Sequence, residues 1–456
     1  MRKRIFAGAV LALGLAVPAF AFHFAALFGL VKGDVDRAVA YVRDVMVIVN
    51  EKYVDPKAVN FADLARNALH GMVESLDPHS EFLEKKDNDD LAEDLSGEFG
   101  GVGIQVEVRS GKVQVIEPMD DTPAARAGIE RGDEIESIDG RSVAGSGAMD
   151  AVVDRLRGKP HTHVAMTLYR PKAHKSYSVD LEREIIKVDS VIDTRVIDDD
   201  VGYVLVTEFS EHTGEQFAAA LDKLLKQNIN SLIIDLRNNP GGTLDSAVEV
   251  AEPFFRKGDL IVSTRGRRAE DNEEFRSEAD GDPLDLPVAV LINQDTASAA
   301  EIVTGALKDT GKAVVVGERS FGKGSVQTII DFKTGDGLRL TTAKYYTPSG
   351  VSLHQVGVAP SVEVVLSAAD DDKIRQQQLR PDISDPADFK ARFGFTPIDD
   401  RQLDAAVAVL RGVEVLESQA AASSRVAGGR PSAVSCSFQP RAARVEISGL
   451  PPHDRG

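Results

Sequence analysis

Between Val188 and Val365 the chain alternates short apolar segments with longer amphipathic ones, and this alternation limits the fold more than any other feature. The apolar segments predict strands: VGYVLVTEF, SLIIDLR, PVAVLIN and KAVVVGE. The segments between them have apolar residues near a period of 3.6 and predict helices: GEQFAAALDKLLKQ, TLDSAVEVAEPFF and SAAEIVTGALKD. Strands that are apolar on both faces belong in a parallel sheet covered by helices. We therefore expect an α/β core over residues 188–365.

The segments on either side of this core differ in their periodicity. Residues 34–97 have a helical period, whereas residues 98–183 contain short alternating strands and two helix-like segments, which predicts a compact β module. Residues 366–417 predict further helices. Residues 418–456 are aperiodic and rich in Ser, Ala, Gly and Arg, and we expect them to be disordered. The expected fold class is therefore multidomain, α/β and β, with N-terminal helices.

The first residues have the pattern of an export signal. MRKR is followed by an apolar stretch and by AFA at 19–21, which fits a cleavage site, so residues 1–31 predict a signal peptide. The apolar character continues to Val31, and residues 5–31 are long enough for an uncleaved membrane anchor. Both alternatives place the rest of the chain in the periplasm.

Composition excludes several kinds of site. The 53 basic and 72 acidic residues give a net charge of −19, which argues against nucleic acid as a partner. The single cysteine, Cys436, allows no disulfide within the chain, and His161 and His163 have no third ligand at a metal-binding spacing. We expect neither a metal nor a cofactor.

Three polar loops follow three of the predicted strands. They are RNNPGG (237–242), NQDTASAAE (293–301) and ERSFGKGSVQ (318–327). Catalytic groups of parallel α/β sheets gather at the carboxyl ends of the strands. If the three strands are neighbours, the loops face one crevice.

Ser298 and Lys323 are the candidate reactive side chains in these loops. Ser298 stands at a predicted helix start, where it can be either an N-cap or an exposed nucleophile. Lys323 lies between two glycines as either a surface charge or a base, and a lysine acts as a base only when its pKa is lowered by desolvation. Gln327 is four residues further along an extended segment, so its side chain shares a face with that of Lys323.

Acyl transfer also needs N–H donors for the oxyanion. Gly241, Gly242 and Ala299 are candidates because each precedes or opens a predicted helix, where backbone N–H groups lack partners. The alternative for the two glycines is an ordinary turn between a strand and a helix.

Together these motifs resemble the carboxyl-terminal processing proteases, which are tail-specific Ser–Lys peptidases with a PDZ domain. The resemblance covers residues 35–415 and rests on LDPHSEFL, FGGVGIQV, DLRNNPGG, NQDTASAAEIVTGALKD, GERSFGKGSVQ and LTTAKYYTPSG. It implies a core with the crotonase- and Clp-protease-like spiral and an exported serine endopeptidase that cleaves near protein C-termini. Ser298 would be the nucleophile, Lys323 the general base and Gln327 the residue that orients the lysine. Oxyanion donors would be Ala299 and either Gly241 or Gly242.

The resemblance makes residues 98–183 a PDZ-like module. Such a module adds a peptide as a strand and binds its terminal carboxylate through backbone N–H groups. Gly101, Val102, Gly103 and Ile104 are the expected substrate-binding residues, together with Arg157 as either a charged contact or a surface side chain. Expected partners are proteins or peptides with free apolar C-termini, and a homo-oligomer or an adaptor protein is left open.

Two other functions fit parts of the sequence. A catalytically inactive PDZ scaffold would bind C-termini without turnover. An acyl-CoA hydratase-like enzyme would use similar glycine-rich oxyanion loops, although the export signal disfavours a coenzyme A substrate.

Overall fold

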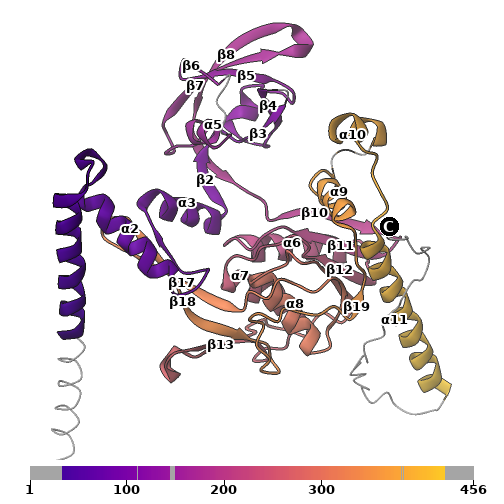
Figure 1. Ribbon diagram of the computed structural model, residues 1–456. Coiled ribbons are helices and arrows are strands. Elements are labelled where there is room, and N and C mark those ends of the chain that lie inside the picture. Colours follow the sequence, from indigo (N-terminus) through magenta and orange to yellow (C-terminus); the bar gives the residue numbers. More distant parts are fainter. Residues whose placement is uncertain (1–32, 110, 144–148, 382, 384, 427–456) are drawn as a thin grey trace, which may run out of the picture. The chain divides into compact units, whose positions relative to one another are not determined.

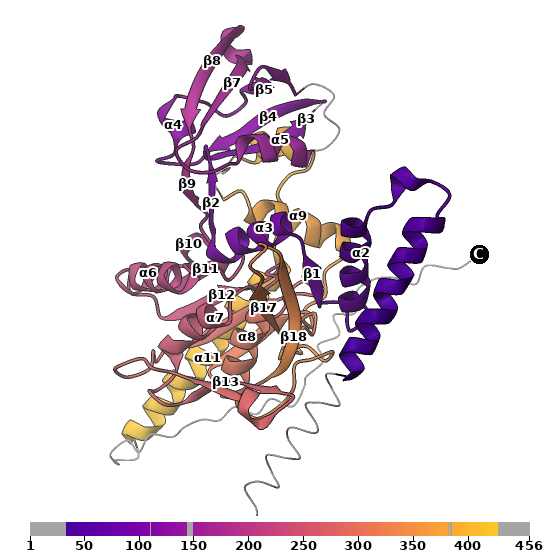
Figure 2. The ribbon, with the colours of Figure 1, turned by 90° about the vertical axis from the view of Figure 1, so that its left-hand side faces the viewer.

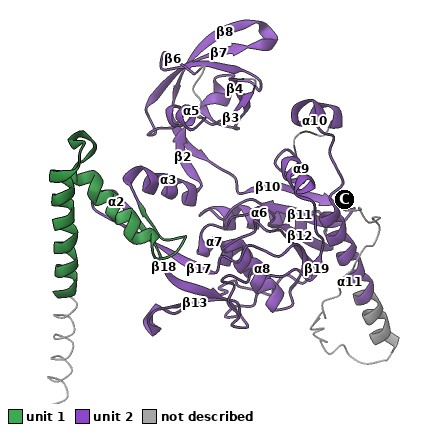
Figure 3. Cartoon of the chain, viewed as in Figure 1, with its two compact units in different colours: residues 1–82, 338–340 green, residues 83–337, 341–456 purple. Residues whose placement is uncertain are grey.

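The computed structural model describes residues 33–109, 111–143, 149–381, 383 and 385–426 (Figure 1). The chain divides into two compact units, residues 1–82 with 338–340 and residues 83–337 with 341–456 (Figure 3). The expected signal peptide or anchor at 1–31 lies outside the described residues, as does most of the expected disordered tail.

The first unit is mainly helical. Residues 33–52 form a helix, followed by η1 (Pro56–Ala58) and α2 (Phe61–Glu74). Asn60 caps α2, because its side chain accepts a hydrogen bond from the N–H of Asp63 at 2.9 Å. The short strand β1 (Glu81–Leu83) follows. No helix in the described part of the chain is long and apolar enough to span a membrane.

The PDZ-like module is an antiparallel sheet around its own apolar core (Figure 2). The strand order is β3-β4-β5-β7-β8, which leaves β3 at an edge, and the interior includes Val115, Ile138 and Met166. A second pair, β2 with β9, is also antiparallel. The elements are β2 (Glu98–Gly101), β3 (Ile104–Arg109), β4 (Lys112–Pro118), α4 (Pro123–Arg126), β5 (Glu134–Ile138), β6 (Arg141–Ser142), α5 (Met149–Leu156), β7 (His163–Arg170), η2 (Pro171–Ala173), β8 (Lys175–Glu182) and β9 (Glu184–Lys187).

The expected α/β core has a six-stranded sheet in the order β10-β11-β12-β15-β16-β19. All its strand pairs are parallel except β10 with β11, so the sheet is parallel with one antiparallel edge strand. The strands are β10 (Val191–Ile197), β11 (Val201–Val206), β12 (Ser231–Asp235), β15 (Val288–Ile292), β16 (Ala313–Gly317) and β19 (Val362–Glu363). Every residue of β11, β12 and β15 is buried, which explains their continuous apolar sequence.

Helices cover both faces of this sheet because alternate strand residues point to opposite sides. Val204, Ile234 and Val290 pack with the first group of helices, and Tyr203 and Leu291 pack against the last helix. The first group is α6 (Thr213–Leu225), α7 (Leu244–Ala251) and α8 (Ala299–Asp309), and the last helix is α11 (Arg401–Val426). Helix α11 continues past residue 417, where we placed the start of the tail.

The remaining elements are a further group of paired strands and several helices. Strands β13 and β18 form an antiparallel pair, β14 pairs with β13, and β17 pairs with β18. Their bounds are β13 (Leu260–Gly266), β14 (Glu273–Arg276), β17 (Ser325–Asp331) and β18 (Gly337–Tyr346). The other helices are α3 (Lys85–Ser96), η3 (Glu252–Phe254), η4 (Ala269–Asp271), α9 (Ala368–Gln378) and α10 (Pro386–Phe393).

Candidate active site

Three loops follow the adjacent strands β12, β15 and β16 at the carboxyl edge of the sheet. We name them the glycine turn (237–242), the serine turn (293–298) and the lysine turn (318–324). Because β12, β15 and β16 are parallel neighbours, the three turns leave the sheet at the same edge.

Ser298 is the last residue of the serine turn and directly precedes the first residue of α8. Its backbone has φ +54° and ψ −117°, an uncommon conformation for a residue with a side chain, and one that costs on the order of 1–3 kcal/mol. The neighbouring Ala297 N–H donates to Asn239 O at 2.9 Å, and the Ser298 N–H donates to Glu301 Oε2 at 2.9 Å. The strained serine is thus fixed from both sides, and only 8% of its surface is exposed.

Glu301 connects the serine turn to the lysine turn. It lies on the first turn of α8 and is fully buried. Its Oε2 accepts from the N–H groups of Ser298 at 2.9 Å and Lys323 at 2.8 Å. Its Oε1 accepts from the N–H of Gly322 at 2.8 Å and from Ser320 Oγ at 2.5 Å. Burial raises the pKa of Glu301, and these four donors oppose that rise.

The shared carboxylate determines the backbone position of both candidate reactive residues. The amide nitrogens of Ser298 and Lys323 lie within hydrogen-bonding distance of the same oxygen atom. Sequence reasoning did not select Glu301, although Ser298 followed three residues later by glutamate has the spacing of a capping box. That spacing was the only available signal, and it predicts a helix start rather than a bridge to a distant turn.

A second segment, His354 and Gln355, also contacts the lysine turn. Gln355 N–H donates to Gly322 O at 2.8 Å, and a Cβ built on Gly324 would lie 2.2 Å from the nitrogen of His354. Gly324 therefore allows two backbones to touch directly after Lys323.

Gln327 lies on β17, two residues beyond Ser325. Its Nε2 donates to Ser325 Oγ at 3.1 Å and to Thr341 Oγ1 at 3.0 Å. These bonds hold the amide in one orientation. The predicted role of Gln327 in orienting Lys323 stays a prediction.

The two glycines of the glycine turn meet different neighbours. Gly241 has φ +101°, and a Cβ there would lie 2.6 Å from the Cβ of Ser298. Gly242 has φ +144°, and its Cβ would lie 2.0 Å from Phe209 O. The Gly241 N–H donates to Asn239 Oδ1 at 2.9 Å. Among the described residues, no acceptor lies within reach of the N–H groups of Gly242 or Ala299.

Side-chain amides tie the glycine turn to the serine turn. The Asn238 N–H donates to Asn293 Oδ1 at 2.8 Å, and Asn293 Nδ2 donates back to Asn238 Oδ1 at 3.0 Å. Thr296 Oγ1 donates to Leu236 O at 2.8 Å. The two turns therefore hold each other in register, independently of any substrate.

The predicted peptide-binding segment opens the edge strand β3. The carbonyl groups of Val102 and Gly103 accept from Ala124 N at 3.0 Å and Met119 N at 2.9 Å. Gly103 has φ +73°, and a Cβ there would collide with Thr122. Within the described residues, the N–H groups of Val102 and Gly103 have no acceptor. Such groups beside an exposed strand edge suit a carboxylate.

The other predicted peptide-binding residues have partners or positions that differ from those of Val102 and Gly103. Gly101 belongs to β2 and pairs with Glu184 of β9, whereas Ile104 begins β3 itself. Arg157 follows α5, where its guanidinium lies 4.5 Å above the ring of Phe99 and donates to Glu93 Oε2 at 3.4 Å. Arg157 is thus engaged by residues of this chain.

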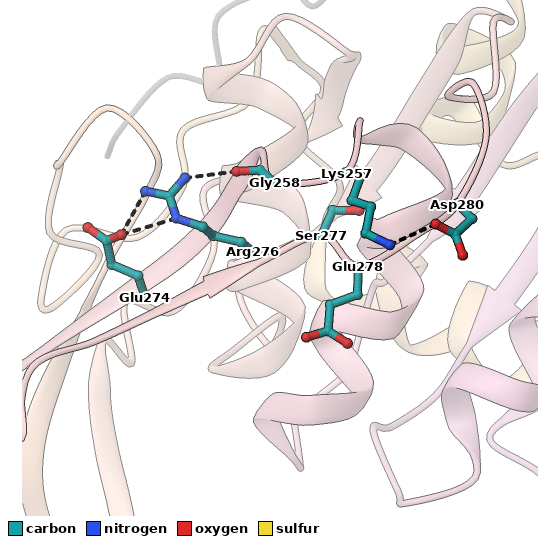
Figure 4. A pocket seen from close by; sticks show the side chains of 7 residues that line it. All are labelled: Lys257, Gly258, Glu274, Arg276, Ser277, Glu278 and Asp280. Atoms are coloured by element: carbon teal, nitrogen blue, oxygen red, sulfur yellow. Dashed lines mark hydrogen bonds and ion pairs between the residues drawn. The ribbon is translucent and has the colours of Figure 1, made fainter.

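A separate hollow of about 650 Å³ lies beside the β13–β14 hairpin (Figure 4). Four of its five charged side chains form ion pairs, Lys257 with Asp280 at 2.7 Å and Arg276 with Glu274 at 2.6 Å, and the fifth is Glu278. None of the predicted site residues lines it. Among the described residues, no three His, Cys, Asp or Glu side chains are grouped to hold a metal ion.

Comparison with known proteins identifies the family. The models of Peptidase family S41 and of the PDZ domain match residues 200–364 and 100–181. A carboxy-terminal-processing protease of Bartonella bacilliformis is 40% identical over 365 residues, covering 76% of this chain and 83% of the relative. A probable CtpA-like serine protease of Staphylococcus aureus is 36% identical over 353 residues, covering 77% and 69%.

Among solved structures, the photosystem II D1 C-terminal processing protease matches with 29% identity and a TM-score of 0.42, covering 71% of this chain and 92% of that one. The recognition made from the motifs is confirmed by the family models and the sequence relatives. The chain belongs to peptidase family S41, among the carboxy-terminal-processing proteases, and it carries a PDZ domain.

Proposed function

We propose that this chain is an exported serine endopeptidase that cleaves protein substrates near their C-termini. Ser298 is the nucleophile, Lys323 the general base and Gln327 the residue that orients the lysine. The observation that carries the proposal is the buried carboxylate of Glu301, which accepts hydrogen bonds from the backbones of both Ser298 and Lys323.

The reaction follows from the two side chains. Neutral Lys323 accepts the proton of the Ser298 hydroxyl as the oxygen attacks the peptide carbonyl carbon. The resulting lysine ammonium then protonates the leaving amine, and an acyl-enzyme forms. Water attacks the acyl-enzyme with Lys323 again as base, which releases the new carboxyl end and restores the serine.

The oxyanion donors are assigned to Ala299 and Gly242. Their N–H groups have no acceptor among the described residues, whereas that of Gly241 donates to Asn239. In this proposal Gly241 acts by lacking a side chain, because its α-carbon passes directly against Ser298. Developing negative charge on the carbonyl oxygen would be stabilised by both donors.

The PDZ domain recognises the substrate end. A peptide would extend the sheet beside β3, and its terminal carboxylate would accept from Val102, Gly103 and Ile104. Gly101 supports the same turn, and Arg157 holds the entry strand through Phe99. Apolar terminal residues suit the apolar interior next to this edge.

The decisive experiment uses a model protein with an apolar C-terminal tag, prepared with a free or an amidated terminus. We expect the wild-type protein to cleave the free-acid form faster, with cuts located near the tag by mass spectrometry. Ser298→Ala and Lys323→Ala should abolish cleavage, while Lys333→Ala, an exposed lysine between β17 and β18, should not.

Each rival predicts another result. An inactive scaffold binds the tag without turnover in any variant, and full activity of Lys323→Ala would remove the proposed base. Equal cleavage of the acid and amide forms would remove tail recognition. Membership in a peptidase family leaves the acyl-CoA hydratase alternative without support.

Export and assembly are further parts of the proposal. The basic and apolar sequence of residues 1–31 supports a periplasmic location, either free or anchored through residues 5–31. Externally added protease should degrade the protein in spheroplasts but not in intact cells; protection in spheroplasts would contradict export.

The helix at 33–52 supports self-association. Its apolar residues Val35, Val42 and Val49 recur every seven positions, with Ala38 and Val45 between them. This is the spacing of a coiled-coil seam with β-branched residues at one position. Val35, Val42 and Val45 are all exposed in the single chain. A second copy of this helix is the proposed partner, and an adaptor protein is the alternative occupant.

A further inference from the structure

Arg237, the first residue of the glycine turn, is held by a carboxylate from the distant C-terminal region. Its guanidinium is 1% exposed. Nε donates to Asp235 Oδ1 at 3.0 Å, and Nη2 donates to Asp235 Oδ2 at 2.6 Å. Nη1 and Nη2 donate to the two oxygens of Asp400 at 3.0 and 2.7 Å, and Nη1 also donates to Gln402 Oε1 at 3.0 Å. All five guanidinium N–H bonds therefore have acceptors.

The two carboxylates differ in their other partners. Asp235 is also bound by Tyr203 Oη at 2.8 Å and Gln378 Nε2 at 2.7 Å, so other partners fix it. Asp400 contributes the outer, two-pronged contact. Burial opposes the charge of Arg237, but the two carboxylates outweigh it and hold its pKa well above the usual value. Loss of one carboxylate would leave a buried charge only partly compensated.

Asp400 is itself rigidly placed. It precedes α11 and accepts hydrogen bonds from the N–H groups of Gln402 and Leu403, both at 3.1 Å. Helix α11 then packs on the sheet through the fully buried Ala406 and Leu410. The position of the Asp400 carboxylate is thus fixed by the packing of α11 on one face of the sheet.

The residues that follow Arg237 in the glycine turn contact Ser298 and the serine turn. Asn238, the next residue, exchanges two hydrogen bonds with Asn293 of the serine turn. Asn239 O accepts from Ala297 N, and Gly241 touches Ser298. A shift of the guanidinium would therefore move the glycine turn relative to the nucleophile.

We propose that Asp400 is a positioning residue, which through Arg237 sets the glycine turn beside Ser298 and makes the start of α11 part of the active-site support. The inference rests on the proposed function, because it concerns the geometry of that same site. It assigns to the C-terminal helical region a role in turnover rather than only in folding.

Asp400→Asn in the full-length protein separates this role from helix capping. Asparagine caps a helix about as well as aspartate, so the start of α11 is kept, but the second carboxylate on Arg237 is lost. We expect kcat for the tagged protein to fall by about 10- to 100-fold, because a small misplacement of catalytic groups has effects of this size. KM should change less than about twofold, since the PDZ domain is untouched.

Two matched variants complete the test. Asp399→Asn makes the same charge change one residue away, on an exposed side chain, and should keep wild-type kcat. Asp400→Glu restores a carboxylate and should recover part of the lost rate. Wild-type kcat in Asp400→Asn, or an equal loss in Asp399→Asn, would overturn the inference.

Further measurements distinguish a loss of positioning in Asp400→Asn from misfolding and from a failure of the proposed function. The rate at which a serine-directed phosphonate labels Ser298 reads the site geometry, and the final extent of labelling counts folded sites; we expect a slower rate with an undiminished extent. If Asp400→Asn does not fold, Gln402→Met removes one acceptor from Arg237 with little change of volume and should lower kcat in the same direction; an unchanged kcat there would overturn the inference. Full activity of Ser298→Ala would instead contradict the proposed function.

Discussion

At the scale of single residues, the site depends on a buried carboxylate that does no chemistry in the proposed reaction. Glu301 accepts four hydrogen bonds from two separate turns, and both turns carry a candidate reactive residue. A buried carboxylate is tolerated only when its lone pairs are used. The same bonds that stabilise its charge therefore fix the backbones of Ser298 and Lys323.

Glu301→Gln should inactivate the protein without removing any catalytic side chain. An amide offers one oxygen, so two of the four donors would face its NH₂ group in either orientation. We expect a fall in kcat of about 100-fold and a loss of about 1–3 kcal/mol in the free energy of unfolding. Steady-state kinetics and urea unfolding measure the two effects. Glu363→Gln, on the exposed side of β19, is the control, and wild-type activity of Glu301→Gln would contradict the role.

Gly241→Ala tests the close approach of the glycine turn to Ser298. The added Cβ would lie 2.6 Å from that of Ser298 and 2.9 Å from the nitrogen of Ala299, so the turn must move. We expect a loss of kcat/KM of about 100-fold. Gly311→Ala is the matched control, because Gly311 also has a positive φ but has open space where the Cβ would go. Equal activity of the two variants would show that the approach has no importance.

At the scale of elements, strand ends and helix starts place the chemistry. Strands β12, β15 and β16 are parallel neighbours, and helix α8 begins directly after Ser298. Helix starts leave N–H groups without partners, and Ala299 has such a group. The edge strand β3 offers the corresponding backbone groups in the PDZ domain. In the proposed function, catalysis and recognition would thus both use backbone that secondary structure leaves unpaired.

Val42→Asp tests the self-association proposed for the helix at 33–52. Val42 lies on the seven-residue stripe and is 46% exposed. A charge in the middle of a coiled-coil seam opposes pairing, so we expect the wild-type protein to sediment as a dimer or larger and the variant to shift toward the monomer. Val47→Asp is the control, since Val47 has a similar exposure of 39% but lies off the stripe. A monomeric wild-type protein would contradict the proposal.

At the scale of the whole molecule, the chain has separate apolar cores. The PDZ domain has its own buried cluster, and the two faces of the catalytic sheet have one each. The PDZ cluster draws only on residues 102–181, whereas the two clusters of the catalytic sheet share the same strands and draw on none of the PDZ residues. We therefore expect the PDZ domain and the catalytic core to respond separately to conditions that affect only one of them.

Acid should destabilise the PDZ domain through Asp133. Burial opposes the charge of this carboxylate, but hydrogen bonds from Arg170, Tyr177 and the Glu130 N–H outweigh burial and lower its pKa. A folded-state pKa below the unfolded value stabilises the fold above the unfolded pKa of about 3.9, and this stability is lost as the pH falls through the folded value.

Asp133→Asn measures that contribution. We expect the variant to lose roughly 3 kcal/mol at pH 7, because Arg170 loses a buried partner, and the difference from wild type should shrink below about pH 4. Calorimetry at several pH values follows the PDZ transition, with the transition of the catalytic core as internal control. A difference that is constant with pH would rule out the ionised carboxylate as its source.

The sequence by itself determined what depends on local periodicity and motif. Continuous apolar strands predicted the buried sheet, alternating strands predicted the β module, and the motifs around Ser298 and Lys323 identified the family before any geometry was available. These features are readable because a strand or helix shows its buried faces in its own few residues. Gln327 was placed on a face by the same rule, which says nothing of its partners.

Only the tertiary structure decided which distant groups meet. No local periodicity in the sequence predicts three of these contacts. They are the antiparallel pairing of β10, the hydrogen bonds of Glu301 to the lysine turn, and the contact of Arg237 with Asp400, 163 residues away. A buried polar group must find a partner, but the partner is whichever group the packing of apolar elements brings within about 3 Å. The pattern of apolar residues can therefore be read from the sequence, whereas the partners of buried polar groups depend on how the elements pack.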